Sequence, residues 1–84
     1  MTPLQREDVT EIVAKQLDVD LVAVVPGARL LEDLRADPVA LAQLTLALEE
    51  RFELFIPDED IAKLATVSDV VVYVAQRVDA AGDR

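Results

Sequence analysis

Hydrophobic residues in the first part of the chain recur at the spacing of an α-helix. The apolar positions that share one helical face are Val9, Ile12, Val13 and Leu17. This pattern predicts a helix over residues 3–17. Thr2 and Gln5, on either side of Pro3, have the arrangement of a capping box, in which side chains satisfy the N–H groups at the start of a helix.

The regular spacing is lost between residues 18 and 37, which predicts a long connection. Pro26 and Gly27 mark a turn in its middle, and residues 21–24 favour one short helical turn. Connections of this length are usually functional or well packed. We therefore expect Leu30, Leu31 and Leu34 to anchor this one to the helices.

A second helix, predicted over residues 38–52, is apolar on nearly every side. Its apolar residues are Val39, Ala40, Leu41, Ala42, Leu44, Leu46, Ala47, Leu48 and Phe52. A helix on the surface of a small domain normally has a single apolar stripe and one polar face. Some of these side chains are therefore expected to remain exposed for a partner, and Leu46 is the clearest candidate.

Two further helices are predicted in the last third of the chain. Pro57 suits the first position of a short helix that ends by Ala65, with the acidic residues 58–60 near its positive terminus. Residues 66–69 have the form of a second capping box and start a final helix that runs to about Asp79. The valine-rich run 70–74 favours a strand by propensity alone. The cap, the helical spacing of its valines and the lack of a second strand favour a helix instead.

The segment Glu32-Asp33-Leu34-Arg35-Ala36-Asp37-Pro38-Val39, together with 46–52 and 56–59, closely resembles the acyl carrier protein family. The resemblance covers nearly the whole chain and implies an all-α bundle of three main helices and one short helix, forming a single domain over residues 1–84. It also implies a serine after Asp37, linked through a phosphodiester to 4'-phosphopantetheine, whose thiol carries the acyl chain.

Position 38 of this chain is a proline. Proline has no hydroxyl group, so we expect that 4'-phosphopantetheine is not attached here and that no other cofactor is bound. The fold should be unaffected, because Asp37 fits the N-cap and a proline in the first turn removes only an N–H that a helix leaves unpaired.

Other positions also depart from the pattern of the family. Arg35 stands where a glycine is common, and Ala40 and Gln43 replace acidic residues that meet basic partners. The predicted partner-binding residues are Arg35, Asp37, Pro38, Val39, Ala42, Leu46, Glu49, Glu50, Asp58 and Glu59. The altered face either suits a more apolar partner or has varied freely after docking was lost, and the sequence leaves both open.

The composition of the chain excludes several classes of ligand and of binding site. The net charge of −9 over 84 residues argues against nucleic acid and for protein partners with a basic or apolar surface. The absence of cysteine and histidine leaves no disulfide and no zinc-ligand spacing. No apolar run is long enough to cross a membrane, so we expect a soluble, cytoplasmic protein that does not bind membranes.

Few side chains are candidates for chemistry. Ser68, in the first turn of the last helix, suits a structural hydroxyl better than a nucleophile. Thr45 lies two turns into its helix, too far from the capped end to replace the missing serine. The carboxylates at 58–60 suit a solvated helix terminus better than a metal site. We therefore predict no catalytic residue, no metal and no enzyme activity.

The sequence supports one leading function and leaves alternatives. The leading interpretation is a carrier-like module that binds protein partners in fatty-acid, polyketide or related acyl metabolism without being loaded. One alternative is an ordinary acyl carrier protein of a biosynthetic system, in which Pro38 is a natural loss or an introduced change. Another is a protein that binds a free lipid non-covalently among its helices. The apolar second helix also allows a weak homodimer.

Overall fold

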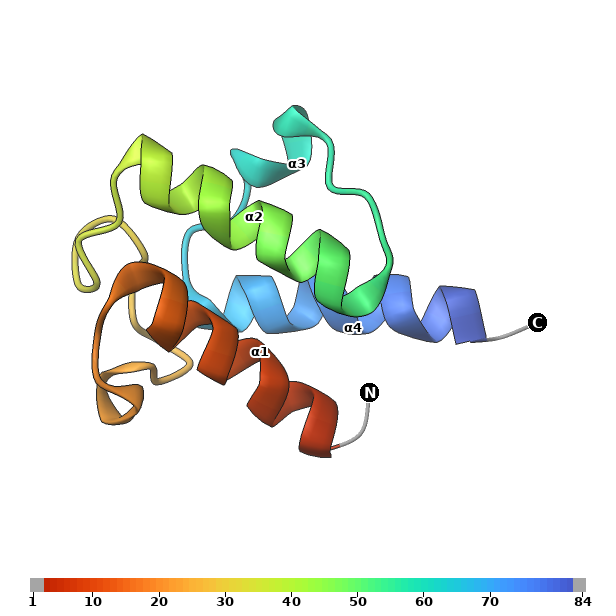
Figure 1. Ribbon diagram of the computed structural model, residues 1–84, viewed down its shortest axis with the longest axis horizontal. Coiled ribbons are helices and arrows are strands. Elements are labelled where there is room, and N and C mark those ends of the chain that lie inside the picture. Colours follow the sequence, from red (N-terminus) through yellow and green to blue (C-terminus); the bar gives the residue numbers. More distant parts are fainter. Residues whose placement is uncertain (1–2, 83–84) are drawn as a thin grey trace.

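The computed structural model describes residues 3–82 and consists of helices joined by loops (Figure 1). The elements are α1 (Pro3–Leu17), the 3-10 helix η1 (Leu21–Ala23), α2 (Pro38–Phe52), α3 (Asp58–Ile61) and α4 (Val67–Gly82). Within residues 3–82 no strand forms, and the β-type pairing there is a single isolated bridge between Arg29 and Thr66. The predicted all-α fold of three main helices and one short helix is confirmed.

The core lies where α1, α2 and α4 meet, and it consists of aliphatic side chains. The residues from these helices with almost no exposed surface are Val9, Val13, Leu44, Leu48, Val67, Val70 and Val74. Val70 and Val74 are one helical turn apart and fully buried, whereas Val72 between them is about half exposed. That alternation has the period of a helix and not of a strand, so the prediction for the valine-rich run is confirmed.

The long connection between α1 and α2 is anchored by two of the three leucines predicted to do so. Leu30 and Leu34 are buried, but Leu31 is 60% exposed, and its predicted role as an anchor is wrong. The cause is a tight turn, in which the N–H groups of Asp33 and Leu34 both donate to the carbonyl of Arg29. The turn directs the leucines on either side of Leu31 inward and leaves Leu31 on its outer face.

The bounds of α3 and α4 differ from the prediction. Pro57 is the N-cap of α3 rather than its first residue, and α3 ends at Ile61 rather than near Ala65. Beyond it, the N–H groups of Lys63 and Leu64 bond to carbonyls three residues earlier, so the chain continues as turns. The helix α4 continues to Gly82 rather than ending near Asp79, in keeping with the high helix propensity of the alanines at 80 and 81.

The predicted capping box at the start of α4 is present. The N–H of Asp69 donates to Thr66 Oγ1 at 3.1 Å, and the N–H of Thr66 donates back to Asp69 Oδ2 at 3.0 Å. The N–H groups of Thr66 and Ala65, which both donate to Asp69 Oδ2, lower the pKa of the Asp69 carboxyl. The capping box predicted at the start of α1 depends on Thr2, which lies outside the described residues.

Candidate functional site

The start of α2 is built as the sequence predicts. Asp37 has an extended backbone, and its carboxylate accepts a hydrogen bond of 2.7 Å from the N–H of Ala40, so it is the N-cap. Pro38 follows as the first helical residue and is exposed. Its fixed φ suits this position, and the helix loses no hydrogen bond there. Position 38 therefore presents the carbons of a pyrrolidine ring to the solvent.

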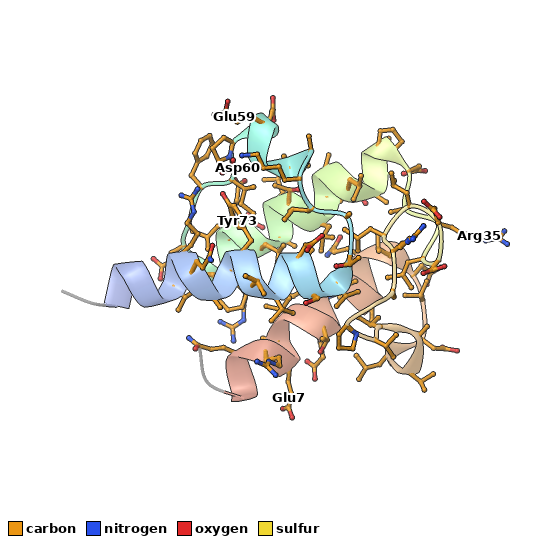
Figure 2. The ribbon with its side chains drawn as sticks, turned by 180° about the vertical axis from the view of Figure 1, so that it is seen from behind. Glu7, Arg35, Glu59, Asp60 and Tyr73 are labelled. Carbon is orange, nitrogen blue, oxygen red and sulfur yellow. The ribbon has the colours of Figure 1, made fainter. Side chains whose placement is uncertain are left out.

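Arg35, two residues before the cap, has an unusual backbone conformation. Its φ is 57°, in the left-handed region that glycine adopts without penalty and that costs other residues about 1–2 kcal/mol. The side chain is exposed and extends away from the bundle (Figure 2). The requirement for left-handed φ explains why a glycine would suit this position, and the arginine adds a positive charge near the start of α2.

Two apolar grooves lie along α2. The first, of about 340 Å³, lies between α2 and the α3 segment and is lined by Pro38, Leu41, Ala42, Asp58, Ile61 and Ala62. The second, of about 260 Å³, is lined by Ala42, Thr45, Leu46, Glu49, Phe55, Ile56, Asp58 and Ile61. Because Ala42, Asp58 and Ile61 belong to both, the two grooves form one continuous surface, which we call the α2–α3 surface.

Large apolar side chains are exposed on α2 and in the segment that follows it. Val39 is 65% exposed, Leu46 is 58% exposed and Phe55 is 71% exposed. Leu46 was predicted to be exposed, whereas Phe55 was not singled out from the sequence. The signal that could have identified it is the extended segment before Pro57, where burial of Ile56 directs its neighbour outward. Apolar groups that gather on a surface commonly mark an interaction site.

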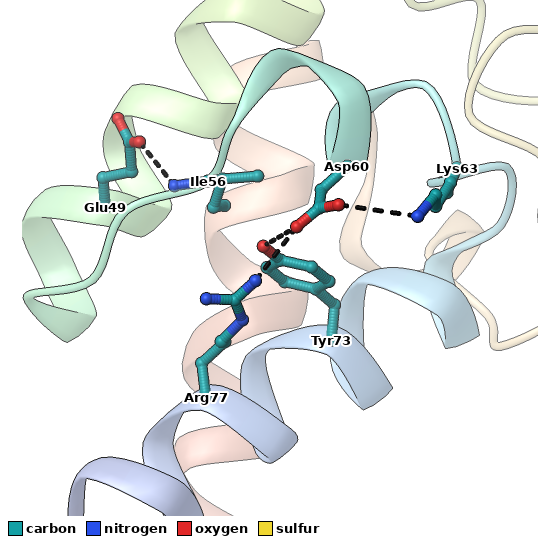
Figure 3. A network of polar contacts seen from close by, with 6 residues as sticks. All are labelled: Glu49, Ile56, Asp60, Lys63, Tyr73 and Arg77. Carbon is teal, nitrogen blue, oxygen red and sulfur yellow. Dashed lines mark hydrogen bonds and ion pairs between the residues drawn. The ribbon is translucent and has the colours of Figure 1, made fainter.

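The predicted partner-binding residues divide into two groups. Those that line the α2–α3 surface are Pro38, Ala42, Leu46, Glu49 and Asp58. The others, which are exposed but do not line it, are Arg35, Asp37, Val39, Glu50 and Glu59. Glu49 also has a structural role, since its carboxylate accepts a hydrogen bond of 2.8 Å from the N–H of Ile56 (Figure 3).

A polar cluster connects α3 to α4. The carboxylate of Asp60 accepts hydrogen bonds from the Tyr73 hydroxyl at 2.7 Å and from the Arg77 guanidinium at 2.9 Å, and Lys63 Nζ lies 3.7 Å away (Figure 3). The guanidinium of Arg77 also stacks over the Tyr73 ring, 4.8 Å from its centre. The cluster holds α3, one wall of the α2–α3 surface, against α4. Sequence reasoning missed it because its members are distant along the chain.

These contacts shift two pKa values in opposite directions. The Tyr73 hydroxyl is the main cause that lowers the pKa of Asp60, and the nearby cations of Lys63 and Arg77 lower it further. Burial is the main cause that raises the pKa of Tyr73, followed by its hydrogen bond to Asp60. At neutral pH the carboxylate is therefore the acceptor and the phenol is the donor.

The remaining candidate hydroxyl groups belong to Thr45 and Ser68. The Thr45 side chain is 7% exposed and its hydroxyl donates to the carbonyl of Leu41 at 2.8 Å. Ser68 lies in the first turn of α4, and its N–H donates to the carbonyl of Pro26. In the part of the chain that the structure describes, no group of three or more acidic, histidine or cysteine side chains is placed to hold a metal. Across the same residues, no helix is long and apolar enough to cross a membrane.

Comparisons with known proteins identify the family. A family model described as a phosphopantetheine attachment site matches residues 7–74. The acyl carrier protein of Helicobacter hepaticus is 47% identical over 68 residues, which cover 81% of this chain and 90% of that protein. Those of Helicobacter pylori and Campylobacter concisus are each 46% identical over 68 residues and 81% of this chain, and cover 87% and 88% of those proteins.

These matches also bear on activity. Acyl carrier proteins are carriers of 4'-phosphopantetheine that work with the enzymes of acyl metabolism and are not enzymes themselves, so the prediction of a non-enzymatic protein is confirmed. The matched residues extend from α1 into α4 and include the whole of α2 and α3. The chain belongs to the acyl carrier protein family.

Proposed function

We propose that this chain is a carrier-like module that docks on protein partners of acyl metabolism but is not loaded with 4'-phosphopantetheine. The observation that carries the proposal is Pro38 at the first position of α2. A phosphodiester needs a hydroxyl oxygen, and the proline ring offers carbon only. Of the neighbouring polar groups, the Asp37 carboxylate caps the helix and the Thr45 hydroxyl is buried and hydrogen-bonded within α2. The residues present therefore do not fit the prosthetic group.

The α2–α3 surface supports the second half of the proposal, docking on a protein. It joins apolar groove residues to exposed Leu46 and Phe55, and acidic residues such as Asp58 border it. Interfaces commonly consist of an apolar centre with aromatic anchors and a polar rim. The complementary partner has an apolar patch surrounded by Lys and Arg. The net charge of −9 opposes a second copy of this chain as that partner.

The first test is a loading assay. The protein is incubated with coenzyme A and a promiscuous phosphopantetheinyl transferase, and its intact mass is then measured. We expect no mass increase for the wild type and one added phosphopantetheine for Pro38→Ser, which supplies the hydroxyl. A stoichiometric adduct on the wild-type protein would refute the proposal, and peptide mapping would then locate the modified side chain.

The second test concerns docking and uses two leucines of nearly equal exposure. Leu46, on the α2–α3 surface, is 58% exposed, and Leu31, in the α1–α2 connection, is 60% exposed. In a pull-down from the native host, Leu46→Glu should lose proteins that the wild type and Leu31→Glu both retain. If all three capture the same proteins, the α2–α3 surface is not the docking site.

The main alternative, an ordinary carrier in which Pro38 is a loss or an introduced change, makes a different prediction. If Pro38 was introduced, the gene in the native host encodes a serine at position 38, and protein isolated from that host carries the prosthetic group. Intact mass of the native protein therefore distinguishes an introduced Pro38 from a natural one.

A further inference from the structure

A separate cleft of about 170 Å³ lies between α1, the α1–α2 connection and α4. Its lining residues are Arg6, Thr10, Val24, Pro26, Val67, Ser68, Val71 and Val72. None of them lines the α2–α3 surface. This cleft is therefore a second concave site, distinct from the one used in the proposed function.

The interior of the cleft is aliphatic. Val24 and Val67 are buried, at 7% and 1% exposure, while Val71 is half-buried and Val72 is 51% exposed. At about 30 Å³ for each group the size of a water molecule, the cleft has room for a chain of about five carbons. Apolar side chains of this kind favour a hydrocarbon chain over a polar ligand.

The polar lining is confined to Arg6 and the hydroxyl residues Thr10 and Ser68. Arg6 is exposed, and in the part of the chain that the structure describes no ion pair joins it to a carboxylate. A guanidinium is a planar donor that matches the geometry of a carboxylate. Arg6 thus places a positive charge beside the cleft on a chain whose net charge is −9.

We propose that this cleft binds an aliphatic monocarboxylate of short to medium chain length. The hydrocarbon chain lies on Val24, Val67 and Val71, and the carboxylate meets the guanidinium of Arg6. The hydroxyl of Ser68 borders the same cleft and is able to donate to a carboxylate oxygen, whereas that of Thr10 already donates to the carbonyl of Glu7 at 2.9 Å. Binding is reversible and non-covalent, so it requires neither Pro38 nor the missing serine.

The experiment is a titration of ¹⁵N-labelled protein, followed by NMR, with butanoate, hexanoate, octanoate and hexan-1-ol. The amides of Val24, Ser68 and Val71 should shift, and affinity should rise about fourfold for each added methylene until the cleft is full. Hexan-1-ol should bind more weakly than hexanoate. Absence of shifts at these amides, or shifts centred on Ala42 and Ile61, would overturn the proposal.

Variants test the role of the cation. Arg6→Gln should weaken hexanoate binding about threefold at low salt, with the loss disappearing as salt is raised, and should leave hexan-1-ol unchanged. Lys15→Gln, which removes the same charge elsewhere on α1, is the matched control and should bind as the wild type does. Equal hexanoate affinity of Arg6→Gln and wild type would refute a carboxylate at Arg6.

Two further variants separate this site from the α2–α3 surface. Ser68→Leu fills the cleft and should abolish the shifts from every ligand, with a dispersed spectrum as proof of folding. Leu46→Glu, designed to disrupt docking, should retain full hexanoate binding. Loss of hexanoate binding in Leu46→Glu would contradict the cleft as the site, whatever the outcome of the loading assay.

Discussion

At the scale of single residues, the chemistry of two neighbouring side chains determines where α2 begins. The Asp37 side chain closes the first turn, and Pro38 supplies the φ that a helix start needs. Both roles follow from residue type and from the order of two neighbours, so both could be predicted from the sequence. The protein has thus kept the framework of the carrier site while position 38 lacks the atom for attachment.

Removal of the cap should be measurable. Asp37→Ala should lower the free energy of unfolding by about 1 kcal/mol, because the N–H of Ala40 loses its acceptor. Asp20→Ala is the matched control, since Asp20 is the N-cap of η1 but its side chain accepts no capping bond. Urea denaturation measures both variants. Equal losses for the two would contradict a specific role for the Asp37 carboxylate.

Arg35 offers the opposite test, a gain in stability. At φ 57°, Arg35→Gly should raise the free energy of unfolding by up to about 1 kcal/mol, because glycine relieves the left-handed strain, offset in part by its freedom when unfolded. Arg35→Ala removes the charge but retains Cβ, and should bring no comparable gain. Thermal unfolding distinguishes the two, and equal midpoints would assign any effect to charge instead.

At the scale of elements, α2 has two apolar faces with different tasks. Leu48 is 1% exposed in the core, whereas Leu46 is 58% exposed on the α2–α3 surface. Leu48→Ala should cost about 2–5 kcal/mol of stability, and Leu46→Ala should change it by less than about 0.5 kcal/mol. Urea denaturation of the two variants measures which face of α2 packs in the core. A large loss for Leu46→Ala would show that Leu46 supports the fold rather than docking.

The elements predicted well are those determined by nearby residues. The bounds of α1 and α2, and the cap of α4, follow from periodicity and capping within a few residues. The bounds of α3 could not be predicted in this way, because α3 is short. Its position depends on contacts of Asp60 in α3 with Tyr73 and Arg77 in α4. The outward orientation of Leu31 depends on the tight turn closed at the carbonyl of Arg29, which the apolar pattern alone does not encode.

The cluster that anchors α3 can be tested through one carboxyl group. Tyr73→Phe deletes the hydroxyl that does most to lower the pKa of Asp60, so the pKa of Asp60 should rise toward its ordinary value. Arg77→Gln should produce a smaller rise, because the charge of Arg77 is a lesser cause. NMR titration of the side-chain carboxyl measures both. A larger effect from Arg77→Gln would reverse the assignment.

At the scale of the whole molecule, stability should depend on pH at both extremes. Asp60 and Asp69 have lowered pKa values, so the unfolded chain binds protons more readily, and their stabilisation is lost as pH falls below about 4. Tyr73 has a raised pKa, so its contribution is present below pH 10 and is lost as pH rises above that value.

The variant Asp69→Asn tests the contribution of one carboxyl group to the pH dependence of stability. Asp69→Asn removes a group that titrates in acid, so its denaturation midpoint should change less than that of the wild type between pH 7 and pH 2.5. Relief of repulsion within the acidic chain affects both proteins nearly equally and largely cancels in the comparison. If the denaturation midpoints of the two proteins changed equally with pH, Asp69 would be excluded as a contributor to the loss of stability in acid.

The way the long connection is bonded to the start of α4 has a consequence for dynamics. The N–H of Leu30 donates to Ala65, that of Val67 to Ala28 and that of Ser68 to Pro26, all at 2.9 Å. The connection therefore cannot loosen without leaving the first N–H groups of α4 without acceptors. Deuterium should replace the amide hydrogens of Leu30 and Val67 only when the entire molecule unfolds, although Leu30 lies in a loop. Two segments far apart along the chain thus form a single cooperative unit.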